Sequence, residues 1–435
     1  MAEKADGFKK YLPLTFLIGA GFFTMGLMDP LYDSYVTIFL SRYIPYKWIV
    51  GMFMALDNVL AIFLIPLISA RSDATKTKIG RRMPWIIVLL PLSALFFSLI
   101  PYAAQYSLMM LVIVLAFLNI FKQSARGPVV ALMPDVVPPE YRSQGNGVIN
   151  TMGNIAGLVG TLFLAQLMDV DTVLPILGAT KNVLAFPVAG ILVVLATIML
   201  LLFVKENKNK LYTEESQEEK IPFLKSMKAV LGGNTQENPG KSDKSAFFVL
   251  LSLFLWFMAY QGMLPYVAEY SILTFNLSMG NGALAAGMVA IASAIFAIPM
   301  GYAAGKWGRK RMIRISLIAV AVILTAQYIL ALMPEVAGES SVYIFWALMF
   351  LFGIFWICIV ANSFPMLWQM AGFTHIGLYT GLYYTFSQAA AILAPFIGGL
   401  IIDFVGHKGV FIYGALFFVA ACITMGRVKH GEKND

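Results

Sequence analysis

Charged residues are scarce in this chain. Only 12% of the 435 residues are Asp, Glu, Lys or Arg, against about 25% in soluble globular domains, and 59% are hydrophobic. This balance excludes an ordinary soluble protein and indicates an integral membrane protein. Windows of about 20 apolar residues, long enough to cross the hydrocarbon as helices, alternate with short polar loops, which favours the helical class over the β-barrel class.

Cysteine and histidine are also rare. The two cysteines, Cys358 and Cys422, both lie in apolar runs, which fits small buried side chains rather than a disulfide framework. The three histidines are scattered, and no metal-ligand spacing, P-loop, dinucleotide-binding fingerprint or nucleophile elbow occurs. We therefore expect neither an enzyme nor a metal or cofactor site.

The hydropathy pattern predicts twelve transmembrane helices. They cover residues 12-40, 48-70, 85-103, 107-133, 145-168, 183-204, 246-275, 281-304, 314-333, 342-368, 376-402 and 409-427. The first run is too long for a cleavable signal peptide. With the N-terminus inside, the cytoplasmic segments hold 25 of the 31 Lys and Arg, as the positive-inside rule expects. We expect a multi-pass protein of the cytoplasmic (plasma) membrane with both termini cytoplasmic, and the net charge needs no nucleic-acid partner.

A long polar segment divides the spans into two groups of six. It predicts a cytoplasmic linker (205-245) between an N-terminal bundle (1-204) and a C-terminal bundle with a cytoplasmic tail (246-435). The halves repeat, because MDPLYDSYVTIF aligns with MLPYVAEYSILTF, KIGRRM with KWGRKRM, and YRSQGNGVINTMGNIAG with HIGLYTGLYYTFSQAAA. Two pseudo-symmetric six-helix bundles predict a transporter with its substrate near the bilayer midplane, and the missing ATP motif favours secondary active transport.

The segment SARSDATKTKIGRRMPWI (69-86) resembles the loop between spans 2 and 3 of the major facilitator superfamily, with an acidic residue at a helix end followed by Gly and paired Arg. The wide spacing from Asp73 to Gly80, with Pro84 after it, is most similar to the glycoside-pentoside-hexuronide cation symporters and the related sucrose-proton symporters. ARGPVVALMPDVVPPEYRSQGNGV and GLYTGLYYTFSQAAAILAPFIGGLIID are similar to the same branch, so the resemblance covers essentially the whole chain. It implies an all-α fold of two six-helix bundles that works by alternating access.

The resemblance also implies a conformational gate in the cytoplasmic loops. The residues are Asp73, Gly80, Arg81 and Arg82 in the first half and Arg309 and Arg311 in the second. The acid and the paired arginines can form a charge network with helix ends that holds the two halves in one access state. Simple positive-inside topology is the alternative. The second-half loop departs from the pattern because it has no acidic residue.

Six ionisable residues lie inside predicted spans, where each costs at least about 2.5 to 3.5 kcal/mol and is a functional candidate. They are Asp29, Asp33, Asp57, Lys122, Arg126 and Glu269. Asp29 and Asp33 share a helix face, and so do Asn119, Lys122 and Arg126. The sucrose symporters carry a carboxylate eight residues before the Gly-Pro of span 4; that position is Asn119 here, so a proton site must lie elsewhere.

The charge count suggests how transport is coupled. Two of the three N-terminal carboxylates can pair with Lys122 and Arg126, and the third then has no fixed partner. A buried acid without a cation can load a proton outside and release it inside. We rank Asp57 first for this role and Asp29 second. The acids could instead gather Na+, but the two cations compete for their oxygens, which favours H+. Asp33 could be only a solvated mouth residue, and Arg126 a snorkelling residue at a helix end.

Neutral polar and aromatic residues suggest the substrate. Amide and phenol groups hydrogen-bond hydroxyls, and aromatic faces stack on sugar rings. We therefore predict a sugar or glycoside rather than a strongly anionic compound, with helix packing as the alternative role of each residue. Glu269 could also be an outer-rim residue. The predicted substrate-binding residues are Asn119, Asn150, Asn154, Gln261, Tyr266, Glu269, Trp356, Asn362, Tyr383, Tyr384 and Gln388.

The prediction is a monomeric sugar or glycoside symporter driven by H+, or alternatively Na+, with no other cofactor. Two rivals stay open. An efflux antiporter for small amphiphilic compounds would have an apolar, Met-rich cavity, and the chain contains 24 Met. A transport-inactive membrane sensor or scaffold would use the long loop to recruit a partner.

Overall fold

The computed structural model describes residues 8–138, 141–175, 178–209, 244–333, 340–371 and 376–429. Within these ranges, twelve helices are long and apolar enough to cross a membrane, which confirms the predicted all-α, twelve-span architecture. They are α2 (Leu12–Ser41), α3 (Lys47–Asp73), α4 (Met83–Tyr106), α5 (Leu108–Val136), α6 (Arg142–Leu158), α7 (Ala185–Phe203), α10 (Ser245–Phe275), α11 (Met279–Trp307), α12 (Arg309–Leu332), α14 (Ser340–Ala371), α15 (Ile376–Val405) and α16 (Gly409–Gly426).

The described chain also contains five short elements. Helix α6 continues through a π-helical turn, η2 (Val159–Leu164), and a 3₁₀ turn, η3 (Ala165–Asp169), to the end of the fifth span. A small antiparallel hairpin pairs β1 (Val173–Leu174) with β2 (Gly178–Ala179). Helix α8 (Glu206–Asn209) lies at the start of the predicted linker, and residues 210–243 of that linker lie outside the described ranges.

The apolar runs form helices because backbone N–H and C=O groups in hydrocarbon must find partners within their own segment. Prolines inside the helices mark the repeat. Pro30 lies inside α2 and Pro265 inside α10, at positions that the sequence alignment of the halves matches. Each proline removes one backbone hydrogen bond from its helix. The repeat read from the sequence therefore has a counterpart in backbone structure.

The helices form two compact units. Unit 1 comprises the described residues of Met1–Pro45, Leu56–Ser216 and Leu277–Leu284, and unit 2 comprises those of Tyr46–Ala55, Gln217–Asn276 and Ala285–Asp435. The first turns of α3 thus belong to unit 2, and the first turns of α11 belong to unit 1. Because α3 and α11 are the second helices of the two repeats, this exchange is itself symmetric.

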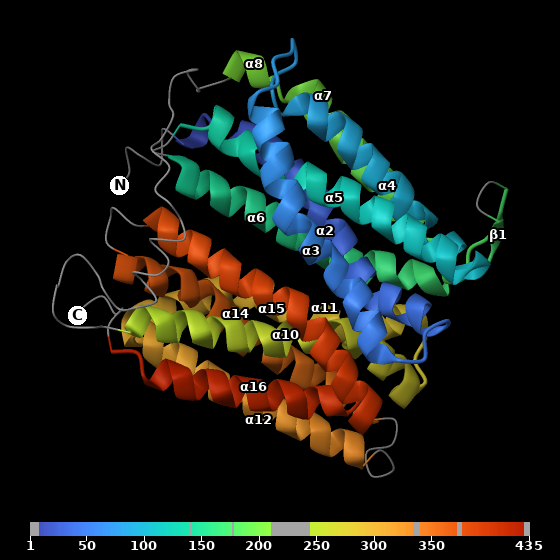
Figure 1. Ribbon diagram of the computed structural model, residues 1–435, viewed down its shortest axis with the longest axis vertical. Coiled ribbons are helices and arrows are strands. Elements are labelled where there is room, and N and C mark those ends of the chain that lie inside the picture. The colour runs from blue at the N-terminus through green and yellow to red at the C-terminus, as the bar shows by residue number, and fades with distance from the viewer. Residues whose placement is uncertain are drawn as a thin grey trace. The chain divides into compact units, whose positions relative to one another are not determined.

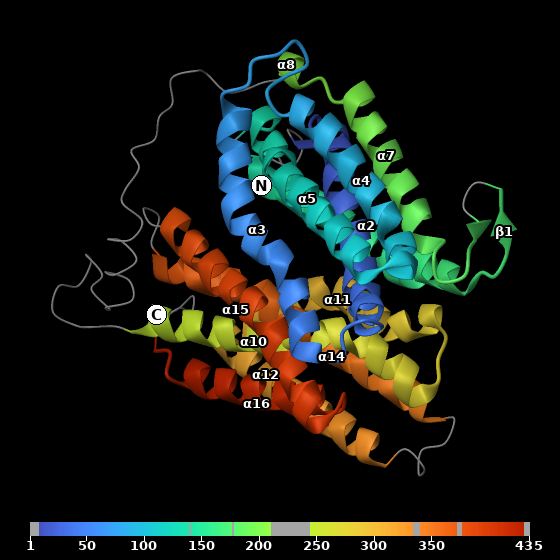
Figure 2. The same cartoon turned by 45° about the vertical axis from the view of Figure 1, so that its right-hand side comes forward.

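Packing inside the units repeats as well. In unit 1, α2 packs on α6 and α7, and α4 packs on α5 and α7; in unit 2, α10 packs on α15 and α16, and α12 packs on α14 and α16. Both views show α4 alongside α5 and α12 alongside α16 (Figure 1, Figure 2). Glycines allow the closest approaches: a Cβ on Gly26 of α2 would lie 2.2 Å from the Gly153 carbonyl of α6, and one on Gly398 of α15 would lie 2.1 Å from the Gly262 carbonyl of α10.

Candidate functional site

A cluster of charged residues lies at mid-helix in unit 1. Lys122 is the central residue of α5, and its ammonium Nζ lies 2.5 Å from Asp29 Oδ1 of α2. The Lys122 side chain is only 8% exposed, whereas that of Asp29 is 48% exposed. A buried ammonium needs a counter-ion, and Asp29 supplies it from a position that solvent can reach.

Tyr32, which sequence reasoning missed, helps to hold this pair. It lies one turn beyond Asp29 on α2, and its ring lies 5.2 Å below the Lys122 ammonium as a cation–π partner. Its hydroxyl accepts a hydrogen bond of 3.1 Å from Asn119 Nδ2. Asn119 is fully buried, and its Oδ1 has no hydrogen-bond partner among the described residues. The structure therefore places Asn119 behind Tyr32 rather than on an open lining.

The other charges of this region are not in direct ion pairs. Asp57 accepts a hydrogen bond of 2.8 Å from the neighbouring Asn58 amide, and Asp33 makes no hydrogen bond or ion pair within the described ranges. Arg126 is exposed, and no described carboxylate lies within 4 Å of it. The sequence predicted two ion pairs among these five residues, and the structure forms one. We call Asp29, Asp33, Asp57, Lys122 and Arg126 the mid-helix charge cluster.

An aromatic cluster lies in unit 2, formed by Phe257, Tyr260, Trp356, Phe364 and Tyr383. Tyr260 and Trp356 stack with ring centroids 4.0 Å apart and planes within 4°. Phe364 and Tyr383 stack at 3.5 Å, and Phe257 meets both Trp356 and Tyr383 edge-on. Tyr384, which is exposed, lies beside Phe364. Two predicted substrate residues, Trp356 and Tyr383, are thus brought together, with Tyr384 at their edge.

The predicted amides differ in accessibility. Asn154 and Asn150 are exposed on α6, although Asn150 Nδ2 donates to the Asn146 carbonyl at 2.8 Å. Gln261 and Gln388 are half-buried. Asn362 is buried and donates to the Cys358 carbonyl at 2.8 Å. The open candidates for hydrogen bonds to a substrate are therefore Asn154, Gln261 and Gln388.

Two further candidates, Tyr266 and Glu269, lie in a different polar cluster of unit 2. Glu269 is buried, with Lys47 Nζ 2.5 Å from its Oε1 and His407 Nε2 3.5 Å from its Oε2. The Tyr266 hydroxyl donates to the carbonyls of Lys47 and Pro395. Glu269 therefore balances the charge of Lys47 at the start of α3. We call Lys47, Glu269, Asp403 and His407 the Lys47 cluster.

Two aspartates cap helix starts in a symmetric manner. Asp403, at the end of α15, accepts from the backbone N–H groups of Lys47 and Trp48 at 2.8 and 3.1 Å. Asp169, at the end of the fifth span, accepts from the Gly280 N–H at 3.1 Å and from the Ser278 hydroxyl at 2.6 Å. A carboxylate at a helix N-terminus is favourable both as a cap and against the helix dipole. Sequence reasoning missed both residues, although extending the alignment of Asn154 with Gln388 without gaps pairs Asp169 with Asp403.

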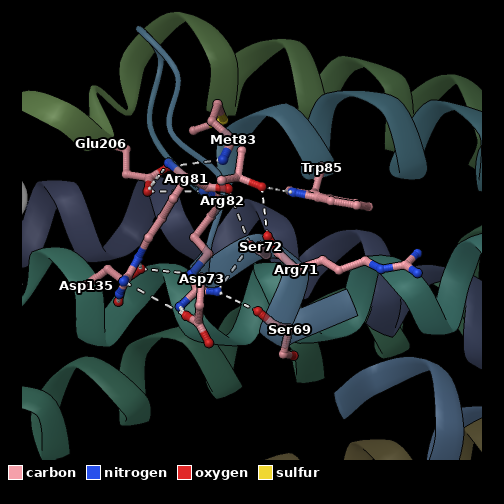
Figure 3. Close-up of polar contacts among 11 residues, drawn as sticks. Ser69, Arg71, Ser72, Asp73, Arg81, Arg82, Met83, Trp85, Asp135 and Glu206 are labelled. Carbon is pink, nitrogen blue, oxygen red and sulfur yellow. Dashed lines mark hydrogen bonds and ion pairs between the residues drawn. The ribbon is translucent and has the colours of Figure 1, made fainter. Parts of the chain in front are cut away.

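The predicted gate loop between α3 and α4 forms a dense network in unit 1 (Figure 3). Asp135, at the end of α5, accepts from both arginines: Arg81 Nε and Nη2 at 2.9 and 2.5 Å, and Arg82 Nε at 2.9 Å. Arg82 also bonds to Asp73. Charge-assisted hydrogen bonds of this kind contribute about 1.5 to 3 kcal/mol each. Asp73, Arg81, Arg82, Asp135 and Glu206 form what we call the arginine cluster.

Glu206 of α8 organises the backbone of the same loop. Its carboxylate accepts from the backbone N–H groups of Arg81, Arg82 and Met83 at 2.8 to 3.1 Å, which caps the start of α4. Gly80 has φ +121°, and a Cβ there would lie 2.1 Å from Glu206 Oε2. The glycine of the loop motif is thus required by its own backbone and by this carboxylate. Sequence reasoning missed Asp135 and Glu206.

The second-half loop shares the backbone of this motif but not its charges. Gly308, aligned with Gly80, also has a positive φ of 92°. Arg309 and Arg311 follow it at the start of α12, and no carboxylate in the described ranges lies within 4 Å of either. Asp73, Asp135 and Glu206, the partners of Arg81 and Arg82 named above, lie in unit 1, so the arginine cluster fastens α3, α4, α5 and α8 to one another.

The comparisons with known proteins agree with this fold. A model of the Major Facilitator Superfamily matches residues 11–295 and 275–434. No curated protein matches the sequence. Among solved structures, a D-xylose-proton symporter is similar with a TM-score of 0.70 and 14% identity over 98% of this chain and 99% of that chain. A bacterial homologue of the human lysosomal transporter Spinster gives 0.70 and 13% over 96% of each chain.

A solved nucleoside transporter is also similar, with a TM-score of 0.66 and 12% identity over 96% of this chain and 99% of that chain. At these low sequence identities, the structural similarity shows a shared fold and does not indicate the substrate. The family model, by contrast, accounts for nearly the whole sequence, including both repeats. The protein therefore belongs to the Major Facilitator Superfamily.

Proposed function

We propose that this protein is a secondary active transporter that couples the symport of a sugar or glycoside to H+ by alternating access, on the glycoside-pentoside-hexuronide and sucrose-proton branch of its superfamily. The observation that carries the proposal is the mid-helix charge cluster. Helices α2 and α3 supply three carboxylates to this cluster, and only Asp29 is in direct contact with the buried Lys122 ammonium. The mid-helix charge cluster therefore has three carboxylates but only two cations, Lys122 and Arg126.

The coupling step follows from this imbalance. The pair of Asp29 with Lys122 is neutral as a unit, while Asp57 has only the amide of Asn58 as a hydrogen-bond donor among the described residues. A carboxylate inside a membrane without a cationic partner is costly when ionised. Binding a proton neutralises the carboxylate and removes that cost. The proton is released when the site opens to the other side of the membrane. Asp33 and Asp57 both meet this condition. Asp57 is our first choice for the titrating group because it lies nearer the middle of its helix than Asp33 does, and Asp29 is second.

H+ is favoured over Na+ by the number of oxygens. Na+ is a hard cation that requires several oxygen ligands. Lys122 already occupies an oxygen of Asp29 that Na+ would need. A proton needs only one carboxylate oxygen.

The aromatic cluster supports a sugar or glycoside. Trp356 and Tyr383 are buried. Tyr260 and Phe364, by contrast, are half-buried and Tyr384 is exposed, so these last three rings offer faces on which a sugar can stack. In the same unit, the half-buried amides of Gln261 on α10 and Gln388 on α15 can donate hydrogen bonds to hydroxyls and accept them. One structure that shares the fold is a D-xylose-proton symporter, and another is a nucleoside transporter, whose substrates contain a sugar ring. We propose the plasma membrane as the location, with both termini cytoplasmic, because the Lys and Arg excess follows the positive-inside rule.

A thermal-shift screen of the purified protein tests the substrate class, since a ligand that binds the folded state raises its apparent stability. Mono- and disaccharides are compared with hydrophobic cations, each with and without Na+. We expect a saccharide to raise the unfolding temperature without Na+. Shifts from hydrophobic cations alone would favour efflux of amphiphilic compounds. Uptake of the hit into proteoliposomes then separates a transporter from an inactive sensor.

A further inference from the structure

Unit 2 carries an apolar groove lined by residues of α12 and α16. These two helices pack side by side (Figure 1, Figure 2). The volume of the groove is about 460 Å³, within the range of about 300 to 1,000 Å³ typical of ligand pockets. Most of the lining residues are aliphatic. The Thr325 hydroxyl donates its hydrogen bond to the Ala321 carbonyl of its own helix, so the groove suits an apolar ligand. Lining residues include Ile318, Val322, Ala326, Ile329, Val419 and Ile423.

The length of the groove matches one leaflet of a bilayer. From Ile318 to Ile329 the rise of α12 is about 16 Å, and the hydrocarbon core of a bilayer is about 30 Å thick. Its walls face outward from the unit, since Val322 is 63% and Ile423 59% exposed. The groove is thus placed and sized for one acyl chain that lies along the helices.

Two arginines stand at one end of the groove. Arg314 precedes Ile318 by one turn of α12, and Arg427 follows directly after the last residue of α16. The backbone next to Arg427 lies close to Arg314, because a Cβ on the preceding residue, Gly426, would lie 3.8 Å from the Arg314 guanidinium. Both are exposed, and among the described residues no carboxylate lies within 4 Å of either. The Arg427 guanidinium is steadied by the ring of Phe248, 5.7 Å away.

We propose that this groove is a binding site for one anionic phospholipid, with an acyl chain along α12 and α16 and the phosphate held between Arg314 and Arg427. Arginine binds phosphate through paired hydrogen bonds, and basic pockets between transmembrane helices select anionic headgroups. A zwitterionic lipid would fill the same groove but would bring no net charge to the arginines. In the proposed orientation, the lipid belongs to the cytoplasmic leaflet. The site is separate from the proposed transport function.

The test compares lipid binding by native mass spectrometry of the full-length protein. The probes are phosphatidylglycerol and phosphatidylcholine with identical acyl chains. Arg314→Gln/Arg427→Gln removes the headgroup contacts, and Ala326→Phe fills the groove. Arg71→Gln/Lys78→Gln is the matched control: it removes two exposed cations of unit 1, and Arg71 extends away from the arginine cluster in Figure 3. Thermal unfolding of each variant in detergent establishes that it is folded.

We expect the wild-type protein and the control to prefer phosphatidylglycerol by about tenfold or more, since each cation near the lipid contributes about a factor of five. Arg314→Gln/Arg427→Gln should bind the two lipids equally. Ala326→Phe should weaken the binding of both lipids, because it fills the groove but leaves both arginines in place. Equal binding of both lipids by the wild-type protein, or a loss in the control as large as that in the double variant, would overturn the proposal.

Discussion

The ion pair between Asp29 and Lys122 is a contact between two single residues, and its presence is measurable by a double-mutant cycle. In the wild-type background, Asp29→Asn removes the counter-ion of a buried ammonium and should lower stability. In a Lys122→Met background, the same change removes an acid that has lost its partner, so it should raise stability. We expect a coupling free energy of about 1 to 3 kcal/mol from thermal unfolding in detergent.

The control for this cycle is Arg126→Gln. Arg126 is exposed and makes no ion pair in the described part of the chain. The changes in unfolding free energy caused by Arg126→Gln and Asp29→Asn should therefore add without coupling. Coupling of Asp29 to Arg126 rather than to Lys122 would mean that the pairing is different from the one seen here.

Gly80 is a second residue whose identity follows from geometry. Its φ of +121° disfavours any side chain, and a Cβ would collide with the Glu206 carboxylate. Gly80→Ala should therefore destabilise the protein by about 1 to 3 kcal/mol. Gly147→Ala is the matched control, because a Cβ at this helical glycine of the same unit meets nothing within 4 Å. Alanine is the better helix former, so the control should be neutral or slightly stabilising. Equal melting temperatures for the two variants would refute this explanation of the loop glycine.

At the residue scale, the sequence indicated candidates but not their neighbours. Intramembrane charge identified Asp29, Asp57 and Lys122 because each costs free energy in hydrocarbon. It could not show that Lys122 chooses Asp29, or that Tyr32 and Asn119 stand behind the pair, because these contacts join side chains far apart in the chain. Asn119 looked like a lining residue by helical spacing, and only packing shows that it is fully buried.

At the scale of elements, the two aspartate caps predict local effects. Asp403→Ala removes the acceptor for the first N–H groups of α3, and Asp169→Ala does the same for α11. Each loss should cost about 0.5 to 2 kcal/mol. Hydrogen exchange should rise at Lys47 and Trp48 in the first variant and near Gly280 in the second, each without an effect on the other helix. Unchanged exchange in both variants would show that the caps do not hold these helix starts.

Element positions were the most predictable feature. The twelve spans follow from apolar run length alone, because the bilayer fixes how many residues a helix needs. The ends of the elements were less predictable. Asp135, Glu206 and Lys47 lie near helix ends, and their partners come from other helices, so nothing local in the sequence marks them. The symmetric pair of Asp169 and Asp403 was within reach of the sequence through the internal repeat.

At the scale of the whole molecule, the two units share a packing pattern but carry different polar and aromatic clusters. Unit 1 carries the mid-helix charge cluster and the arginine cluster. Unit 2 carries the aromatic cluster and the Lys47 cluster. Symmetry of packing supplies the two bundles that alternating access requires. The proposed function assigns the ion mainly to unit 1 and the sugar mainly to unit 2.

The central claim is that an unpaired acid of the first repeat couples transport to protons. The most direct test compares sugar accumulation driven by a pH gradient with sugar exchange at equal pH, in proteoliposomes that contain Asp57→Asn. Asp171→Asn is the control, because Asp171 is an exposed hairpin residue paired with Lys181. We expect Asp57→Asn to keep exchange and to lose gradient-driven accumulation by at least about tenfold, the effect of about 1.4 kcal/mol, while the control behaves as wild type. Full gradient-driven accumulation by Asp57→Asn would contradict the account.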